Sequence, residues 1–261
     1  MTSMLCWIGR DTHAPPASIY IATDSRISWS SQNWDFGRKT YASTETADIF
    51  GYCGDVLFPS LVLSQFVSAL NEGLYPRDFE SRRAGLERLV RVSLKAMPRW
   101  GRGPFTILHC GRDAEKMDSV FHAATLAWRK GDWSMKRLSL PQNTSGVVHI
   151  DGIGSDAVRA AIVARSANAD GGTTRGLFRS FVEALATDKV GSSGGAPQLV
   201  GLYRIRGGMS FGVLHHGKRF LYGMPVHDLA QDSDLAWHNE LFERASGVTR
   251  SRLPGAQSHT A

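Results

Sequence analysis

The chain has 261 residues, of which 42% are hydrophobic and 21% are charged. This length supports one large core or two small ones, which excludes a peptide, a disulfide mini-protein and a fibre. The 30 Lys and Arg against 24 Asp and Glu give a net charge of +6, without a dense basic run. Such a diffuse excess favours solubility over nucleic-acid binding.

The apolar runs are short and the cysteines are few. The longest apolar stretches, 57–63 and 66–70, fall well short of the ~20 residues that span a bilayer, so no membrane partner is expected. Cys6, Cys53 and Cys110 are odd in number and widely spaced, which argues against a disulfide framework and a structural zinc site. The first residues lack the pattern of a secretory signal. We therefore expect a cytoplasmic protein whose fold begins almost at residue 1.

Hydrophobic periodicity predicts strands and then helices in the first part of the chain. Short β-rich runs lie at 2–9, 18–23, 39–43 and 48–53, and the first two form a hairpin across the turn at 11–16. Apolar residues then recur at helical spacing, which predicts amphipathic helices over 58–70 and 79–97, the second ending before Pro98.

The second part of the chain repeats this order. Strands are predicted at 105–110, 120–128, 133–138 and 147–150, helices at 158–164 and 177–185, and strands at 198–206 and 210–215. Gly171 and Gly172 break the helix pair, and Gly207 and Gly208 supply a hairpin turn. Because the strands arrive in hairpins, antiparallel sheets with helices in outer layers are favoured over a parallel sheet. The pattern predicts an α+β fold, a four-layer αββα sandwich.

One domain accounts for most of the chain. We assign residues 1–225 to the layered domain and residues 226–261 to a C-terminal segment. In that segment a helix is expected around 235–245, and the Gly, Ser, Pro and Arg content of 246–261 is typical of a mobile tail.

The first candidate for chemistry is Thr2, directly behind Met1. A small residue here is of the type whose preceding Met is usually removed, which exposes a hydroxyl and an α-amino group on one residue. Such a residue is nucleophile and general base at once, because an α-amine with a pKa near ~7.7–8.0 is partly unprotonated at neutral pH. Taken alone, a Thr in second position is common and decides nothing.

Three further residues fit the same chemistry. Asp24 follows the second predicted strand, and Lys39 begins the third. A Lys beside the terminal amine favours its unprotonated form and stabilises an oxyanion, while Asp24 pairs with Lys39 and orients it. Gly54 ends the next strand, where its N–H can face a scissile carbonyl as an oxyanion hole. The plain alternatives are a surface ion pair and a loop glycine.

The turn at 152–157 admits two interpretations. Its Gly-x-Gly-x-x-Ala pattern fits the phosphate turn of a dinucleotide-binding module, but the acidic residue expected about 20 positions on is absent. Alternatively, Ser155 begins a helix and relays protons to Thr2. Asp188 ends the next helix, and Asp188 and Ser193 are candidates to hydrogen-bond the terminal amine.

In this order the motifs resemble the proteasome β-subunit and HslV branch of the N-terminal nucleophile (Ntn) hydrolases, a family of threonine peptidases. The resemblance covers Thr2 to about Gly223. It is carried by the opening strand at 2–11, the Asp-Ser-Arg strand end at 24–26, Lys39, Gly54, the Gly-Ser turn at 154–155 and Asp188 followed by Ser-Gly-Gly at 193–195. It implies the αββα fold, autonomous exposure of Thr2 and amide hydrolysis through an acyl-enzyme on Thr2 Oγ. The implied catalytic residues are Thr2, Asp24, Lys39, Gly54, Ser155, Asp188 and Ser193.

The chain departs from the family pattern in three places. Residues 12–18 enlarge the first hairpin, and the segment after Val226 has no counterpart in the short bacterial members. Asp188 and Ser193 lie two residues farther apart than in the family, so either Ser192 or Ser193 fills the serine role.

The leading hypothesis is a threonine-type endopeptidase, one subunit of a ring-forming homo-oligomer that cleaves proteins or peptides, with an ATPase unfoldase as a candidate partner. Two alternatives stay open. One is a non-catalytic, proteasome-like structural or interaction subunit, and the other is an Ntn amidase or acylase acting on a small amide, because a fold does not fix a function. No cofactor, metal or nucleic acid is expected.

Two histidine-containing pairs receive no role. His109 with Cys110, and His215 with His216, lie on predicted strands, where one member of each pair is expected in the core and the other in solvent. The acidic ligands that a hard metal would need are not expected to cluster near them.

Overall fold

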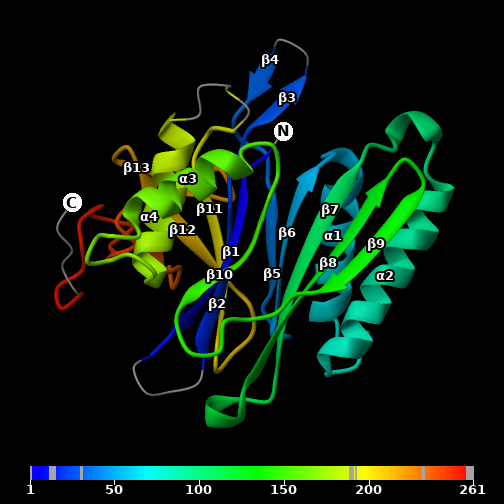
Figure 1. Cartoon of the computed structure of the whole chain (residues 1–261), viewed down its shortest axis with the longest axis horizontal. Coiled ribbons are helices and arrows are strands. Elements are labelled where there is room, and N and C mark those ends of the chain that lie inside the picture. The colour runs from blue at the N-terminus through cyan, green and yellow to red at the C-terminus, as the bar shows by residue number, and fades with distance from the viewer. Residues whose placement is uncertain are drawn as a thin grey trace.

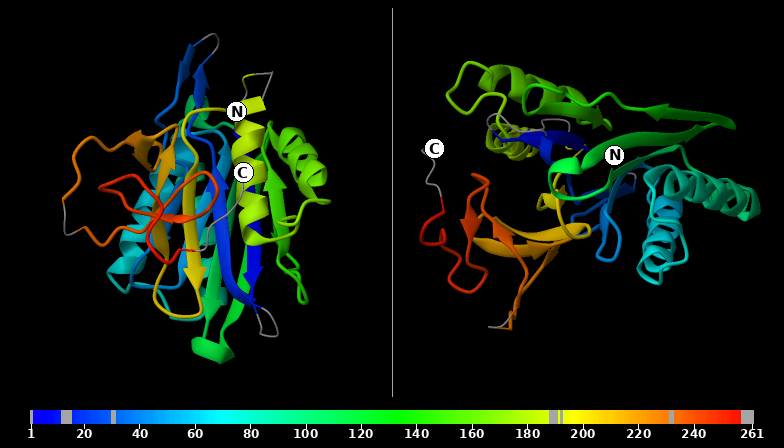
Figure 2. Two further views of the ribbon diagram at one scale, coloured as in Figure 1. Left: turned by 90° about the vertical axis from the view of Figure 1, so that its left-hand side faces the viewer. Right: turned by 90° about the horizontal axis from the view of Figure 1, so that it is seen from below.

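The computed structural model describes residues 2–11, 16–29, 32–187, 191, 193–230 and 233–256. Within them the chain is a mixed α and β protein with four α-helices and predominantly antiparallel sheets. Two large sheets face each other, and a pair of helices lies on the outer side of each (Figure 1). The two further views in Figure 2 show the same arrangement.

The larger sheet has nine strands and contains the N-terminus. Its path runs β10, β1, β2, β11, β12, β13, β14, with β15 attached to β12 and β16 attached to β15. The bounds are β1 Met4–Arg10, β2 Pro16–Thr23, β10 Gly146–Asp151, β11 Gln198–Tyr203, β12 Met209–His215, β13 Lys218–Leu221, β14 Met224–Pro225, β15 Trp237–His238 and β16 Arg244–Ala245. The β12–β15 pairing is parallel, whereas the other pairings in this sheet are antiparallel.

The second sheet is a five-stranded antiparallel meander in the order β5-β6-β7-β8-β9. Its strands are β5 Thr40–Ser43, β6 Asp48–Gly54, β7 Phe105–Asp113, β8 Val120–Arg129 and β9 Asp132–Arg137. A small hairpin of β3 Ile27–Trp29 and β4 Gln32–Trp34 stands apart from both sheets at the end of the molecule near the N-terminus (Figure 1).

Four helices are described, α1 Leu57–Asn71, α2 Phe79–Ala96, α3 Ser155–Arg165 and α4 Thr174–Thr187. A side chain caps the start of two of them, α2 and α4. The Asp78 side chain accepts a hydrogen bond from Ser81 N at the start of α2, and Thr173 Oγ1 accepts one from Gly176 N at the start of α4. Among the described residues, no helix is both long and apolar enough to cross a membrane.

Three apolar clusters show which surfaces pack together. One joins α1 and α2 to the five-stranded sheet, including Phe50, Phe66 and Val90. A second lies between the two sheets, and a third joins α3 and α4 to the nine-stranded sheet, where Trp7 and Phe178 meet. Both sheets therefore have buried residues on both of their faces over much of their length.

This double burial corrects the expectation for His109 and Cys110. Both side chains are buried, because β7 has the helices on one face and the other sheet on its opposite face. The rule that alternate residues face core and solvent applies to a sheet with one wet face, and β7 has none along this stretch.

The predicted elements match the observed ones closely up to β12. Every predicted strand and both predicted helix pairs are present, with ends shifted by a few residues. The short strands β3, β4 and β13 to β16 were not predicted, because two to four residues are too few to establish a period.

The helix expected around 235–245 is wrong. These residues form β15 and β16, joined by a turn in which Asn239 Oδ1 accepts hydrogen bonds from Leu241 N and Glu243 N. An Asn side chain that captures nearby backbone N–H groups stabilises a turn at the expense of a helix. The prediction of a mobile tail is also wrong as far as residue 256. Backbone hydrogen bonds hold this part of the chain, with Ser246 N donating to Ser251 O and Leu253 N donating to Arg244 O. Residues 257–261 lie outside the described part of the chain.

Candidate active site at the start of β1

The first residues before β1 are held between the ends of two neighbouring strands. β1 pairs with β2 on one side and β10 on the other, so that Met4 lies opposite both Thr23 and Asp151. Asp24 N donates to Ser3 O at 3.2 Å, and Gly154 N donates to Thr2 O at 3.4 Å. Thr2 is completely buried.

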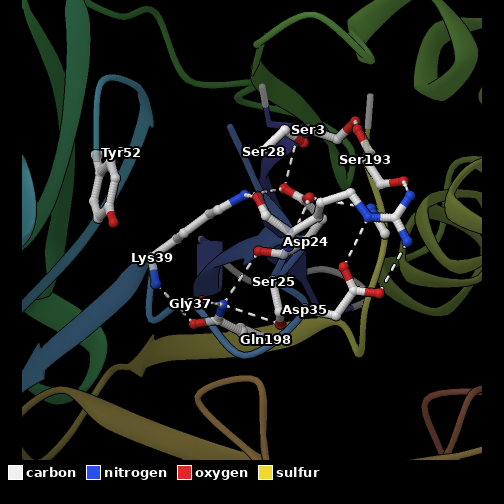
Figure 3. A network of polar contacts seen from close by, with 12 residues as sticks. Ser3, Asp24, Ser25, Ser28, Asp35, Gly37, Lys39, Tyr52, Ser193 and Gln198 are labelled. Atoms are coloured by element: carbon white, nitrogen blue, oxygen red, sulfur yellow. Dashed lines mark hydrogen bonds and ion pairs between the residues drawn. The ribbon is translucent and has the colours of Figure 1, made fainter. Parts of the chain in front are cut away.

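Asp24 is the centre of the polar network beside Thr2. Its Oδ1 accepts hydrogen bonds from Ser3 N at 3.0 Å and Lys39 Nζ at 2.8 Å, and its Oδ2 accepts from Arg26 N and Gly194 N at 3.1 Å each. Figure 3 shows Lys39 and Ser3 converging on this carboxylate. With four donors and full burial, the carboxylate is held in one orientation.

Lys39 reaches the network from the start of the opposite sheet. It immediately precedes β5, and its Nζ donates to Asp24 Oδ1 and, at 2.5 Å, to Arg26 O. Burial lowers the pKa of Lys39, while the carboxylate of Asp24 opposes that change. A lysine in such a place gives up its proton more readily than one in solvent.

Gln198 fixes the backbone around both charged residues. Its side chain is 1% exposed, and its Nε2 donates to Asp24 O at 3.1 Å and to Gly37 O at 2.7 Å. Its Oε1 accepts from Lys39 N at 2.9 Å. One amide group therefore ties β11 to the ends of β2 and β5, and nothing in the sequence pattern singled it out.

Arg26 holds the loop that carries Ser193. Its guanidinium makes a two-pronged ion pair with Asp35, at 2.7 and 2.9 Å, and donates to Gly191 O and Ser193 O. Ser193 Oγ lies 2.6 Å from Ser3 Oγ, within hydrogen-bond distance. Ser193 is thus brought beside the residue that follows Thr2.

The turn between β10 and α3 packs directly on Thr2. Gly152 has φ +98°, and a Cβ at this position would lie 2.0 Å from Thr2 O. A Cβ on Gly154 would lie 2.0 Å from Ser3 Oγ and 2.5 Å from Ser193 Oγ. The absence of side chains therefore admits the N-terminal segment. Ser155 is half-buried at the first position of α3.

This packing contradicts the dinucleotide interpretation of the turn. In a phosphate turn the glycines let a pyrophosphate approach the backbone, within a parallel βαβ unit. Here Thr2 and Ser3 occupy the space next to the glycines, and β10 pairs antiparallel with β1.

Gly54 is the last residue of β6. Because β5 and β6 are antiparallel, Gly54 lies at the same end of the five-stranded sheet as Lys39, which precedes β5. It has φ +96°, and a Cβ there would lie 2.3 Å from Pro104 O, so that only glycine fits. The preceding Cys53 is buried near Asp151 and Lys39, and burial together with Asp151 raises the pKa of its thiol.

The structure therefore brings together Thr2, Asp24, Lys39 and Ser193, and it sets Ser155 and Gly54 at the ends of adjoining elements. Asp188 and Ser192 lie outside the described residues. Asp35 and Gln198 were missed. A search for polar residues flanking predicted strands would have included Gln198 among many others, whereas Asp35 flanks only β4, which was not predicted.

The arrangement has the components for acyl transfer. A buried lysine and carboxylate lie beside the two residues before β1, Thr2 and Ser3, both of which carry a hydroxyl. Freed of Met1, Thr2 would add an α-amine to this set. Lysine and α-amine together can activate a hydroxyl without a metal ligand set.

A cavity of about 800 Å³ lies elsewhere, beyond the opposite end of β1. Its lining includes Arg10, Tyr20, Tyr203 and Phe211, and none of Thr2, Asp24 or Lys39. Size alone does not make it the reactive site, because the buried ion pair and its hydrogen bonds lie at the other end of the strand.

The expectation that no acidic ligand lies near the histidine pairs is also wrong. Asp48 Oδ1 lies 2.7 Å from His109 Nε2, and Glu240 Oε1 lies 2.6 Å from His215 Nδ1. The acidic residues are far away in sequence, and strand pairing brings them close. Among the described residues, His215, His216 and Glu240 form a group able to hold a metal ion.

Comparison with known proteins assigns no family to the chain. No family model matches the chain, and no curated protein matches it in sequence.

Proposed function

We propose that the chain is an Ntn hydrolase of the threonine type, built on a four-layer αββα sandwich. The observation that supports this most is the fully buried Lys39–Asp24 pair, 2.8 Å apart, next to the first residues of β1. A buried ion pair costs desolvation free energy, so its presence is weak evidence of a stabilising role. Its position beside Thr2 favours a role in chemistry.

In the proposed mechanism, removal of Met1 frees the α-amine of Thr2. The amine accepts the hydroxyl proton as Thr2 Oγ attacks the carbonyl carbon of an amide. The oxyanion that forms is stabilised by the N–H of Gly54 and the charge of Lys39. The amine then returns the proton to the departing nitrogen, and an ester on Thr2 Oγ remains. Water cleaves this ester and restores the free hydroxyl.

The surrounding residues hold the reacting groups in place. Asp24 orients Lys39, and Gln198 fixes the backbone of both. Ser193 contacts Ser3, the residue after Thr2, and Ser155 follows Gly154, whose N–H donates to Thr2 O. For Asp188, which lies outside the described residues, the proposal keeps the acidic role that the family resemblance implies. Preorganised dipoles of this kind cost no reorganisation during the reaction.

The proposed substrate is a peptide bond, and the proposed particle is a ring of identical subunits in the reducing cytoplasm, with an ATPase unfoldase as candidate partner. The resemblance in motif order supports these assignments. A small-amide substrate and a non-catalytic subunit are the competing outcomes of the tests below.

The test compares hydrolysis of a peptide panel with hydrolysis of simple acyl amides by wild type, Thr2→Ala, Thr2→Ser and Thr44→Ala. Thr44 is an exposed threonine and serves as the matched control. We expect Thr2→Ala to lose at least about 10³-fold in kcat/KM, Thr2→Ser to retain part of the activity and Thr44→Ala to match wild type. Full activity in Thr2→Ala would refute the proposal, and activity confined to acyl amides would identify an amidase.

A further inference from the structure

We propose that His215, His216 and Glu240 bind one divalent transition-metal ion of the Zn²⁺ class at the edge of the nine-stranded sheet. This site is separate from the Thr2 network and does not depend on the proposed function. It lies where the turn after β12 meets the turn after β15.

Strand pairing brings the three residues together. β12 and β15 run parallel, with Gly212 opposite Trp237 and Val213 opposite His238. Continued for two residues, the same register sets His215 opposite Glu240, just past the end of β15. The next residue, His216, has φ +50° in the tight turn before β13, and its N–H donates to Glu240 Oε1 at 3.0 Å.

The potential ligand atoms already lie close to one another. Glu240 Oε1 is 2.6 Å from His215 Nδ1 and 3.7 Å from His216 Nδ1, and one ligand atom from each residue fits within a 4.8 Å group. Zinc–ligand bonds of about 2.0–2.1 Å place tetrahedral ligands about 3.3 Å apart. Small rotations of the carboxylate and of His216 would therefore suffice to enclose an ion.

The nitrogen of His215 is the second observation that points to a ligand. It is buried and has no hydrogen-bond partner, although the Glu240 carboxylate lies 2.6 Å away. A buried ring nitrogen that faces an oxygen without a well-directed hydrogen bond carries a cost.

The ligand types select the class of metal. Two imidazoles and one carboxylate suit Zn²⁺, Co²⁺, Ni²⁺ or Cu²⁺, whereas Mg²⁺ and Ca²⁺ prefer oxygen ligands. The His216 side chain is 75% exposed, so solvent can supply a fourth ligand. An ion here would join β15 to the β12–β13 turn and clasp the C-terminal segment onto the sheet.

The experiment uses the full chain without a histidine tag, stripped of metal and titrated with Co²⁺ and Zn²⁺. We expect one Co²⁺ per chain with visible absorption typical of a four- or five-coordinate site, displaced by Zn²⁺. His216→Ala and Glu240→Gln should weaken binding at least tenfold, and His227→Ala, which removes an exposed histidine of the same segment, should bind as wild type.

Circular dichroism and the melting temperature separate loss of metal binding from loss of the fold. His216 is largely exposed, so His216→Ala should retain the circular dichroism of wild type. Its melting temperature should fail to rise on addition of Zn²⁺, whereas that of wild type rises. Absence of a stoichiometric site in wild type, or equal affinity in His216→Ala and wild type, would overturn the proposal.

Discussion

The Asp24–Lys39 pair is buried so deeply that each member depends on the other. Both side chains are completely inaccessible, and the carboxylate also orders three backbone N–H groups. An unpaired charge in such a place is much costlier than the intact pair is stabilising. The two residues should therefore behave as one unit in mutagenesis.

A double-mutant cycle tests this coupling. Asp24→Asn should lower the free energy of unfolding by about 3–5 kcal/mol, because it leaves the Lys39 charge unpaired. Adding Lys39→Met should restore part of the loss, since the charge is then gone. Urea denaturation measures each free energy. The partly exposed pair of Glu87 and Arg91 supplies the control, where Glu87→Gln should change stability by less than about 1 kcal/mol. Additive losses at Asp24 and Lys39 would contradict the coupling.

The pH dependence of hydrolysis tests the role of Lys39. Below the pKa of the Thr2 amine the base is protonated, so kcat/KM should rise with pH on the acid side. Because burial lowers the pKa of Lys39, the charged lysine should be lost below the ordinary value of 10.5, and kcat/KM should fall again there. Lys39→Arg keeps its charge at higher pH, so any residual activity should lack this alkaline fall. If kcat/KM falls at the same alkaline pH in wild type and in Lys39→Arg, the fall comes from a group other than Lys39.

Among single residues, the sequence indicated Asp24 and Lys39 but not Asp35 or Gln198. Asp24 and Lys39 stand next to strand ends and match a family pattern. Gln198 opens β11 and carries three contacts to the site, yet a glutamine at a strand start has no distinctive spacing. Its importance comes from the tertiary pairing of β2 with β11.

Among the elements, the β10–α3 turn matters most for the site. A phosphate-binding turn and a turn that seats an N-terminus both need glycines, because both require close approach to backbone. The pattern at 152–157 could not distinguish them. The distinction lies in what fills the space, namely Thr2 O next to Gly152.

A matched pair of glycine variants tests whether Gly152 is needed to admit Thr2 beside the β10–α3 turn. Gly152 and Gly131 have similar φ values, +98° and +102°, but a Cβ on Gly131 would meet nothing within 4 Å. Gly131→Ala should cost about 1–2 kcal/mol from backbone strain and leave hydrolysis unchanged. Gly152→Ala should cost about 2–5 kcal/mol, since overpacking adds to the strain, and should reduce kcat/KM strongly. Urea denaturation measures the stability of each variant, and peptide hydrolysis measures its kcat/KM. Equal activity in the two variants would argue against a role of Gly152 in positioning Thr2.

For the whole molecule, the C-terminal segment belongs to the fold and is not an appendage. Trp237 is buried against Gly212 of β12, and the Phe242 ring packs on Tyr20 and Phe178 at 5.5 and 5.2 Å. The boundary drawn at residue 225 therefore separates a layered body from strands that complete its larger sheet. The sequence of the C-terminal segment did not indicate these strands, because β15 and β16 have two residues each.

Removal of the buried indole tests this integration. Trp237→Ala should lower the free energy of unfolding by about 3–5 kcal/mol through lost burial and a new cavity. Trp100→Ala is the control, because Trp100 is 84% exposed and should change stability by less than about 0.5 kcal/mol. Equal effects in urea denaturation would show that the segment contributes little to the core.

The intact mass of the purified chain, taken before and after treatment with a peptide-like β-lactone that acylates N-terminal threonine, tests Thr2 as the nucleophile. We expect a chain without Met1 that gains one adduct. Fragmentation should locate this adduct on Thr2, and Thr2→Ala should lack it. A chain that retains Met1 and forms no adduct, or an adduct that maps to another residue such as Cys53, would contradict Thr2 as the nucleophile.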